Sequence, residues 1–135
     1  MPVLSYAPRI LIIEDEPSVR DFFEGALAQD GYYTTAVASA REGLAAARNR
    51  EFELVVLDFS LPDGDGIELL KQLRAEIPHL QILATSGFMV ADMPALAMAA
   101  GASATLAKPT TAHALRNSVY QLLDPSRAWA AGNAG

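Results

Sequence analysis

Four short apolar segments of this chain each end in a polar side chain that can take part in chemistry. Glu14 and Asp15 follow RILII, Asp58 follows ELVVL, Ser86 follows QILAT and Lys108 follows ATLA. If these segments are parallel strands of one sheet, the polar side chains meet at its carboxyl edge, where open α/β sheets bind ligands. The pattern predicts a single pocket in which several carboxylates face one lysine.

The residue types in this pocket restrict its chemistry. Two ionised carboxylates about 4 to 5 Å apart repel by roughly 4 kcal/mol at an effective dielectric near 20, so the cluster needs a counter-charge. Mg²⁺ suits it, because this ion takes oxygen ligands and often bridges a carboxylate to a phosphoryl group. A fixed lysine pairs with a further oxygen, and a hydroxyl donates to another. The set predicts a site where an aspartate is the nucleophile toward phosphorus, with a metal ion and a lysine neutralising charge.

The elements that must position these residues alternate along the chain. Apolar runs at 9–13, 32–37, 53–57, 80–84 and 104–106 predict strands, and helical patterns separate them, which is typical of repeated βαβ units and a parallel sheet. The expected helices are one from Pro17 to Gly31, one capped by Ser39 and Glu42 that runs to about Arg48, one capped by Asp65 and ended before Pro78, one over 92–100 that stops at Gly101, and one from Thr111.

Length and composition limit the class of protein. With 135 residues, 51% of them apolar and 19% charged, the chain is expected to be one globular domain. Its net charge of −6, without any run of Lys or Arg, argues against nucleic-acid binding by this chain alone. It has no cysteine, no signal-peptide pattern and no apolar run long enough to span a bilayer, so we expect a cytoplasmic protein that does not enter the membrane.

Taken together, the motifs resemble the response-regulator receiver domain of two-component signalling. The residues that carry the resemblance are the acidic pair in ILIIEDEP, the segment LVVLDFSLPDGDG, the segment ILATSG, and LAKP, and it covers residues 8–123. It implies a flavodoxin-like, doubly wound α/β fold, with five parallel strands in the order 2-1-3-4-5 and helices on both faces. Residues 1–7 would be an N-terminal extension and residues 124–135 a C-terminal tail.

The resemblance assigns roles around the phosphorylation reaction. Asp58 would accept a phosphoryl group from a phosphohistidine on a histidine kinase or a histidine phosphotransfer protein. Ser86 would donate a hydrogen bond to a phosphoryl oxygen. Lys108 would pair with the phosphoryl group, or with Asp58 before phosphorylation. The protein would be a signalling module that switches partner binding, and would catalyse only its own phosphorylation and dephosphorylation.

The resemblance also implies a Mg²⁺ site. Asp15 and Asp58 would coordinate the ion, Glu14 would bind it directly or through water, and the backbone carbonyl of Ser60 would complete the protein ligands. Asp63 and Asp65 are expected to be turn and cap residues, because their stretch lacks the ligand pattern of a calcium loop.

Two positions depart from the family pattern. Thr105 stands where Tyr or Phe usually precedes the lysine as a rotating switch, and Thr110 stands where Phe commonly follows the Lys-Pro pair. Rotation of a large ring therefore cannot be the readout. We expect phosphorylation to reorder the loop at Gly87, Phe88 and Met89 instead, with Phe88 taking part of the role of the missing ring.

Other interpretations of the same residues remain open. Asp58 alone could cap a turn, Glu14 and Asp15 could be acids favoured by a helix dipole, and His79 and His113 are assigned to the surface. The tail can be a frayed end, or Trp129 can dock on the body or on a partner. The chain could also be part of a hybrid histidine kinase or a scaffold that works without phosphorylation. An aspartyl-phosphate phosphohydrolase is disfavoured, because it needs a carboxylate where this chain has Ser60.

Overall fold

A parallel five-stranded sheet forms the centre of the molecule. The computed structural model describes residues 7–61, 66–87 and 92–124. The strands are β1 (Arg9–Ile13), β2 (Tyr33–Val37), β3 (Leu54–Asp58), β4 (Gln81–Ser86) and β5 (Ala104–Ala107). The helices are α1 (Pro17–Ala28), α2 (Ala40–Asn49), α3 (Gly66–Glu76), α4 (Met93–Ala100) and α5 (Ala112–Leu123). Strands and helices alternate along the chain, as the sequence predicts.

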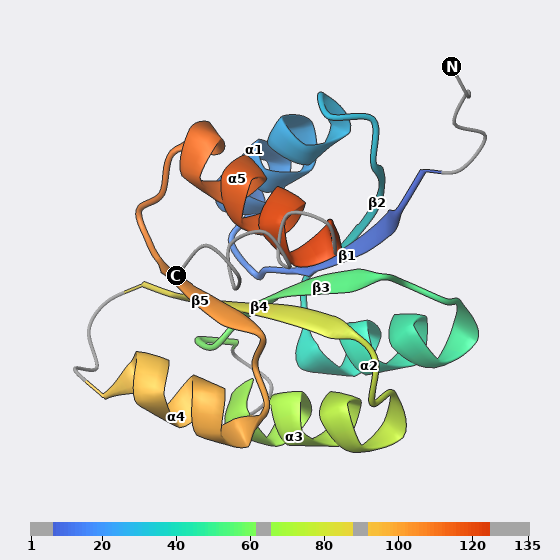
Figure 1. Ribbon diagram of the computed structural model, residues 1–135, viewed down its shortest axis with the longest axis vertical. Helices are drawn as coiled ribbons and strands as arrows, with labels where there is room; N and C mark the ends of the chain where they lie inside the picture. Colours follow the sequence, from blue (N-terminus) through green and yellow to red (C-terminus); the bar gives the residue numbers. More distant parts are fainter. Residues whose placement is uncertain (1–6, 62–65, 88–91, 125–135) are drawn as a thin grey trace.

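The strands lie in the order β2-β1-β3-β4-β5, and every neighbouring pair is parallel. Helices α1 and α5 cover one face of the sheet, while α2, α3 and α4 cover the other (Figure 1). The expected doubly wound fold and strand order are therefore confirmed.

Both faces of the central strands are buried, which explains their continuous apolar sequences. In β3, Val55 and Leu57 belong to the core under α2, α3 and α4, while Leu54 and Val56 belong to the core under α1 and α5. All five residues of β3 are buried. A strand of this kind shows no alternation of polar and apolar residues, because neither face meets water.

Local capping signals define two of the helices. The Ser39 hydroxyl oxygen accepts a hydrogen bond from the Glu42 backbone N–H at 3.1 Å, and a Glu42 carboxylate oxygen accepts one from the Ala38 N–H at 3.2 Å. The hydroxyl oxygen of Thr111 accepts from the Ala114 N–H at 3.0 Å and begins α5. Gly101, with φ of 116°, ends α4 in the left-handed conformation that glycine allows.

Several predicted boundaries were wrong by one to three residues. Strand β3 extends to Asp58 and β4 extends to Ser86, because parallel backbone pairing continues through these polar residues, with Asp58 opposite Thr85. Helix α1 ends at Ala28, and the chain reaches Gly31 through turns whose N–H groups bond back to Leu27 and Ala28. The predicted cap Asp65 lies outside the described residues.

Gly66 allows the start of α3 to approach the end of β3 closely. A Cβ atom at this position would lie 2.7 Å from the Cα and 2.9 Å from the carbonyl oxygen of Phe59. Because backbone atoms cannot rotate aside, we expect Gly66→Ala to lower the free energy of unfolding by about 1–3 kcal/mol in urea titrations. Gly25→Ala is the control, since nothing lies within 4 Å of its added Cβ. Equal stability of Gly66→Ala and the wild type would contradict the close approach.

Candidate functional site

The polar strand ends meet at one edge of the sheet. Strand β1 ends at Ile13, directly before Glu14 and Asp15, and its neighbour β3 ends with Asp58. Strand β4 ends with Ser86, and Lys108 directly follows β5. Figure 1 shows β4 and β5 ending on the same side of the sheet, at the left of the view. The parallel arrangement therefore brings together residues that are up to 94 positions apart in the sequence.

Three carboxylates form a compact cluster at this edge. One carboxylate oxygen from each of Glu14, Asp15 and Asp58 lies within 4.8 Å of the other two. Glu14 and Asp58 are buried, each with 1% of its surface exposed, while Asp15 is half-buried. Among the residues that the structure describes, this is the one group of His, Cys, Asp and Glu side chains that could hold a metal ion.

Lys108 places its ammonium group against two of these carboxylates. Its Nζ lies 2.8 Å from Oε1 of Glu14 and 3.5 Å from Oδ2 of Asp58, and its side chain is 14% exposed. The family resemblance implies Asp58 as the partner of this lysine before phosphorylation. The pair with Asp58 is present, but Glu14 is the closer partner.

The pKa directions follow from burial and from crowding of charge. Burial raises the pKa of Glu14, and the charge of Asp58 raises it further, against the opposing hydrogen bond from Lys108. Burial also raises the pKa of Asp15, followed by the effects of the adjacent Asp58 carboxylate. Burial by itself would lower the pKa of Lys108, but the hydrogen bond to Glu14 and the charges of both acids outweigh it, so this pKa is raised. Three ionised carboxylates and one ammonium sum to −2, the charge that a divalent cation balances.

The two carboxylate oxygens of Asp58 have different partners. Its Oδ1 accepts from the backbone N–H of Ser60 at 2.9 Å, while its Oδ2 faces Lys108. The N–H of Phe59 donates to the carbonyl of Thr85 at 3.0 Å, which fixes the chain directly after Asp58. The carboxylate is therefore oriented by its own loop and by the neighbouring strand.

Ser86 and Lys108 are linked through the backbone. The N–H of Lys108 donates to the carbonyl oxygen of Ser86 at 2.8 Å, and the half-buried Ser86 pairs with Ala107 in the sheet. The hydroxyl and the ammonium group thus come from adjacent strand ends. Both oxygens of Glu14 are engaged, because Oε2 accepts from the N–H of Glu16 at 3.2 Å while Oε1 accepts from Lys108.

Two further residues contact this edge of the sheet and were not predicted from the sequence. Arg20 donates from Nη1 to the carbonyl oxygens of Glu14 at 3.0 Å and Asp15 at 3.3 Å. Thr85 is buried opposite Asp58 in the sheet, with its hydroxyl 3.5 Å from the carbonyl of Leu57. The sequence offered a weak signal for Arg20, a cation one turn into the helix that follows the acidic pair.

The remaining predicted positions lie apart from the cluster or outside the described residues. Thr105 is half-buried in β5 opposite Ala84, while His79 and His113 are exposed, as expected. The predicted positions outside the described part of the chain are Asp63, Asp65, Phe88, Met89 and Trp129. The hypothesis that the loop at 87–89 replaces the aromatic switch therefore stays a prediction.

The fold and the carboxyl-edge cluster define a class of protein: a doubly wound α/β domain whose central aspartate faces further acids and a lysine. A family model described as the response regulator receiver domain matches residues 10–120. The chain belongs to this family, whose members are signalling modules of two-component systems.

Similarity to individual proteins agrees with this assignment. The chain is 34% identical over 109 residues to the response regulator protein FleR of Pseudomonas aeruginosa, covering 81% of this chain and 23% of that one. It is 39% identical over 102 residues to the KDP operon transcriptional regulatory protein KdpE of Escherichia coli, covering 74% and 44%. The chain thus spans less than half the length of these curated relatives.

Solved structures resemble the whole sheet and its helices. The receiver domain of NtrX from Brucella abortus is 31% identical, with a TM-score of 0.82 and coverage of 87% of this chain and 99% of that one. A CheY-like receiver domain protein from Methanospirillum hungatei is 30% identical, with a TM-score of 0.82 and coverage of 86% and 93%. No helix in the described ranges is both long and apolar enough to cross a lipid bilayer.

Proposed function

We propose that Asp58 is the phosphoacceptor, and that it takes a phosphoryl group from a phosphohistidine on a histidine kinase or a histidine phosphotransfer protein. The observation that carries this proposal is the position of the Asp58 carboxylate. It ends the central strand, buried and oriented by Ser60, with Oδ2 3.5 Å from Lys108 and two further carboxylates beside it. A carboxylate beside a fixed ammonium group is suited to attack phosphorus, because the cation offsets the negative charge brought by the phosphoryl oxygens.

The transfer exchanges one bond to phosphorus for another. An oxygen of Asp58 forms the new bond, the phosphorus–nitrogen bond of the phosphohistidine breaks, and the imidazole nitrogen keeps the electron pair and takes a proton from solvent. Lys108 then turns from Asp58 toward a phosphoryl oxygen. The Ser86 hydroxyl, at the end of the adjacent strand, donates a hydrogen bond to another phosphoryl oxygen. Lys108 and Ser86 both lie at this edge of the sheet.

The carboxylate cluster fits Mg²⁺. Its three carboxylate oxygens lie within 4.8 Å of one another, and its net charge is negative. Both properties suit a hard divalent cation, which prefers oxygen ligands. Asp15 and Asp58 would hold the ion with the carbonyl of Ser60, and Glu14 would act through water, since both its oxygens accept hydrogen bonds from the chain. When bound, Mg²⁺ supplies positive charge that neutralises the transferred group.

A direct test uses a purified histidine kinase carrying ³²P on its histidine. We expect the label to move to this chain in the presence of Mg²⁺, and to be released by mild alkali, as expected of an acyl phosphate. A panel of kinases and phosphotransfer proteins identifies the partner by its transfer rate. Failure of every phosphohistidine donor and of acetyl phosphate to label the chain would contradict the proposed function.

An apolar groove beside the cluster is a suitable contact for the phosphohistidine partner. Its volume is about 390 Å³, and it is lined by Val19 and Phe22 of α1 and by Lys108, Pro109 and Thr110 after β5. Phe22 is 43% exposed although it is large and apolar. A partner helix bound here would place its histidine beside Lys108.

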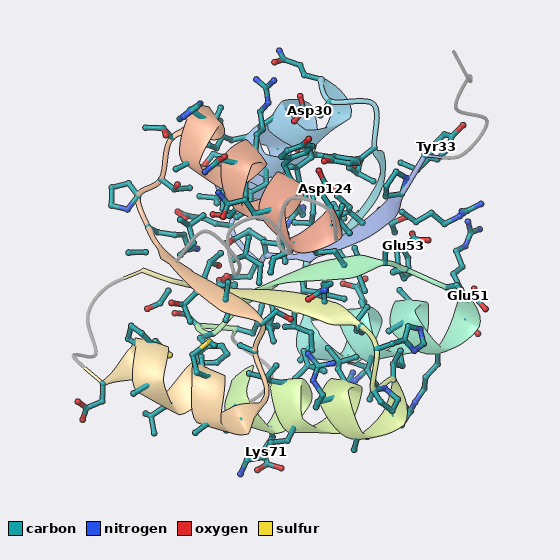
Figure 2. The ribbon with its side chains drawn as sticks, viewed as in Figure 1. Asp30, Tyr33, Glu51, Glu53, Lys71 and Asp124 are labelled. Carbon is teal, nitrogen blue, oxygen red and sulfur yellow. The ribbon has the colours of Figure 1, made fainter. Side chains whose placement is uncertain are left out.

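Phe22→Ala is expected to slow phosphotransfer from a protein donor while leaving the reaction with acetyl phosphate unchanged. Truncation of an aromatic side chain at the centre of a contact costs about 2 kcal/mol of binding or more, so kcat/KM for the protein donor should fall at least about tenfold. Tyr33→Ala is the control, because Tyr33 is 63% exposed at the start of β2. It lies at the right of Figure 2, whereas β4 and β5 end at the left of the same view. Equal loss with both donors would mean that Phe22 supports the site and not the partner contact.

We also propose the extent of the phosphorylated domain and its cellular location. Residues 8–123 form the phosphorylated unit, residues 1–7 are an N-terminal extension and residues 124–135 a C-terminal tail. The protein works in the cytoplasm, where the catalytic domains of histidine kinases meet their receivers. Phosphorylation switches its affinity for a downstream protein.

A further inference from the structure

Arg20 binds the backbone carbonyls of the acidic pair and makes no ion pair with its carboxylates. The Nη1 of this arginine donates to the carbonyl oxygens of Glu14 at 3.0 Å and of Asp15 at 3.3 Å. The backbone N–H of the same residue donates to the carbonyl of Glu16 at 2.9 Å. One residue therefore satisfies three consecutive carbonyl groups, those that join β1 to α1.

The junction between β1 and α1 lacks the usual means of holding a helix start. Its N-cap residue, Glu16, makes no side-chain capping hydrogen bond, and Pro17 at the first helical position has no N–H to donate. The ladder that holds β1 reaches only to the N–H of Glu14, which donates to Val37 at 3.0 Å. Beyond that point Arg20 holds the two carbonyl groups, and the Glu16 N–H is held by Oε2 of Glu14 at 3.2 Å.

The orientation of a peptide group determines the direction of the neighbouring side chains. Glu14 and Asp15 contribute two of the three carboxylates of the cluster, and both lie in the segment that Arg20 holds. A nitrogen that carries two hydrogens can bond both carbonyls at once, so the guanidinium fixes their relative direction. It thereby aims both carboxylates at one point.

Arg20 pairs with no carboxylate among the described residues, so it blocks no oxygen that could bind a metal ion. The four ion pairs within the described ranges involve Arg48, Lys108 and Arg116, and none involves Arg20. An arginine paired with Asp15 would block an oxygen that a cation needs. We infer that Arg20 is a positioning residue, which pre-organises the carboxylates of Glu14 and Asp15 for a divalent cation through their backbone carbonyls. The inference rests on the Mg²⁺ site proposed above.

Positioning and simple electrostatics predict opposite results for Arg20→Met. Removal of a positive charge beside an acidic cluster makes its potential more negative, which by itself strengthens Mg²⁺ binding. Loss of the carbonyl contacts frees the turn, so the carboxylates must be ordered when the ion binds, and Mg²⁺ binding weakens. We expect the second effect to dominate, with a Kd for Mg²⁺ about tenfold higher, as reported for groups that orient metal ligands.

The experiment measures Mg²⁺ binding by titration calorimetry on the full chain, together with the melting temperature in EDTA and at several Mg²⁺ concentrations. Arg20→Lys keeps the charge and one nitrogen donor, so we expect a Kd between those of Arg20→Met and the wild type. Arg116→Met is the matched control. It removes an arginine that pairs with Asp30 at 2.6 Å, just past the C-terminal end of α1. That end lies roughly 15 Å along the helix from Arg20, at about 1.5 Å per residue, so the Kd for Mg²⁺ should stay within about twofold, because charges beyond a Debye length are screened.

Each outcome bears on a different claim. Tighter Mg²⁺ binding by Arg20→Met, or a Kd equal to that of the wild type, would overturn the positioning role while leaving the metal site intact. If Arg20→Met does not fold, the test uses Arg20→Lys. Faster amide exchange at residues 14–16 would show that this folded variant has lost the carbonyl contacts. Wild-type affinity for Mg²⁺ in that variant would then overturn the positioning role as well. Absence of Mg²⁺ binding by the wild type would overturn the proposed metal site, and the role of Arg20 with it.

Discussion

Asp58→Asn is expected to abolish phosphorylation of this chain. The amide keeps the shape of the side chain. Its oxygen can still accept the hydrogen bond from the Ser60 N–H, which measures 2.9 Å in the wild type. A neutral amide is not a nucleophile toward phosphorus, so no acyl phosphate forms. After incubation with acetyl phosphate and Mg²⁺, intact-mass measurement should show one added phosphoryl group on the wild type and none on the variant.

The control for this variant is Asp30→Asn, which removes an aspartate paired with Arg116 at the far end of α1. It should be phosphorylated like the wild type. The Asp58→Asn protein should also remain folded, because Lys108 keeps its 2.8 Å contact with Glu14 and one buried negative charge is lost. Undiminished labelling of Asp58→Asn would show that another residue is the phosphoacceptor.

Asp15→Ala is expected to lose Mg²⁺ binding without loss of stability. It removes a carboxylate that is a proposed direct ligand, so we expect the Kd for Mg²⁺ to rise by at least about tenfold, with loss of Mg²⁺-dependent phosphorylation. The apo protein should be as stable as the wild type or more stable at pH 7, because the change relieves repulsion with Asp58. Calorimetric titration and thermal unfolding in EDTA measure the two effects separately.

The shifted pKa of Asp15 determines whether its contribution to the free energy of unfolding rises or falls with pH. Burial and the Asp58 carboxylate raise this pKa in the folded state above its unfolded value. Between the two values the folded state binds more protons, so the free energy of unfolding falls as the pH rises through this window, and the loss persists at neutral pH. The Asp15→Ala protein should therefore show a smaller loss of stability from pH 4 to 7 than the wild type. Asp21→Ala, which changes an exposed acid of α1, is the control. A large drop in the melting temperature of apo Asp15→Ala would mean that Asp15 has a structural role.

Much of the fold was predictable because its signals are local. Continuous apolar runs identified all five strands, and Ser39, Thr111 and Gly101 marked helix ends that the structure contains. Two strand ends were predicted too early, because pairing with neighbours carries β3 and β4 through Asp58 and Ser86. The strand order came from the family resemblance, since alternation of strands and helices predicts a parallel sheet without specifying its order.

The sequence by itself determined which residues gather at the carboxyl edge, because parallel strands that each end in a polar side chain must place those ends together. Only the tertiary structure decided how they pair. Lys108 lies closer to Glu14 than to Asp58, and Arg20 binds carbonyl oxygens and not carboxylates. These choices depend on side-chain directions and on differences of less than 1 Å between groups far apart in the chain. No pattern of residue types carries that information, because a hydrogen bond depends on the positions of both of its atoms in space.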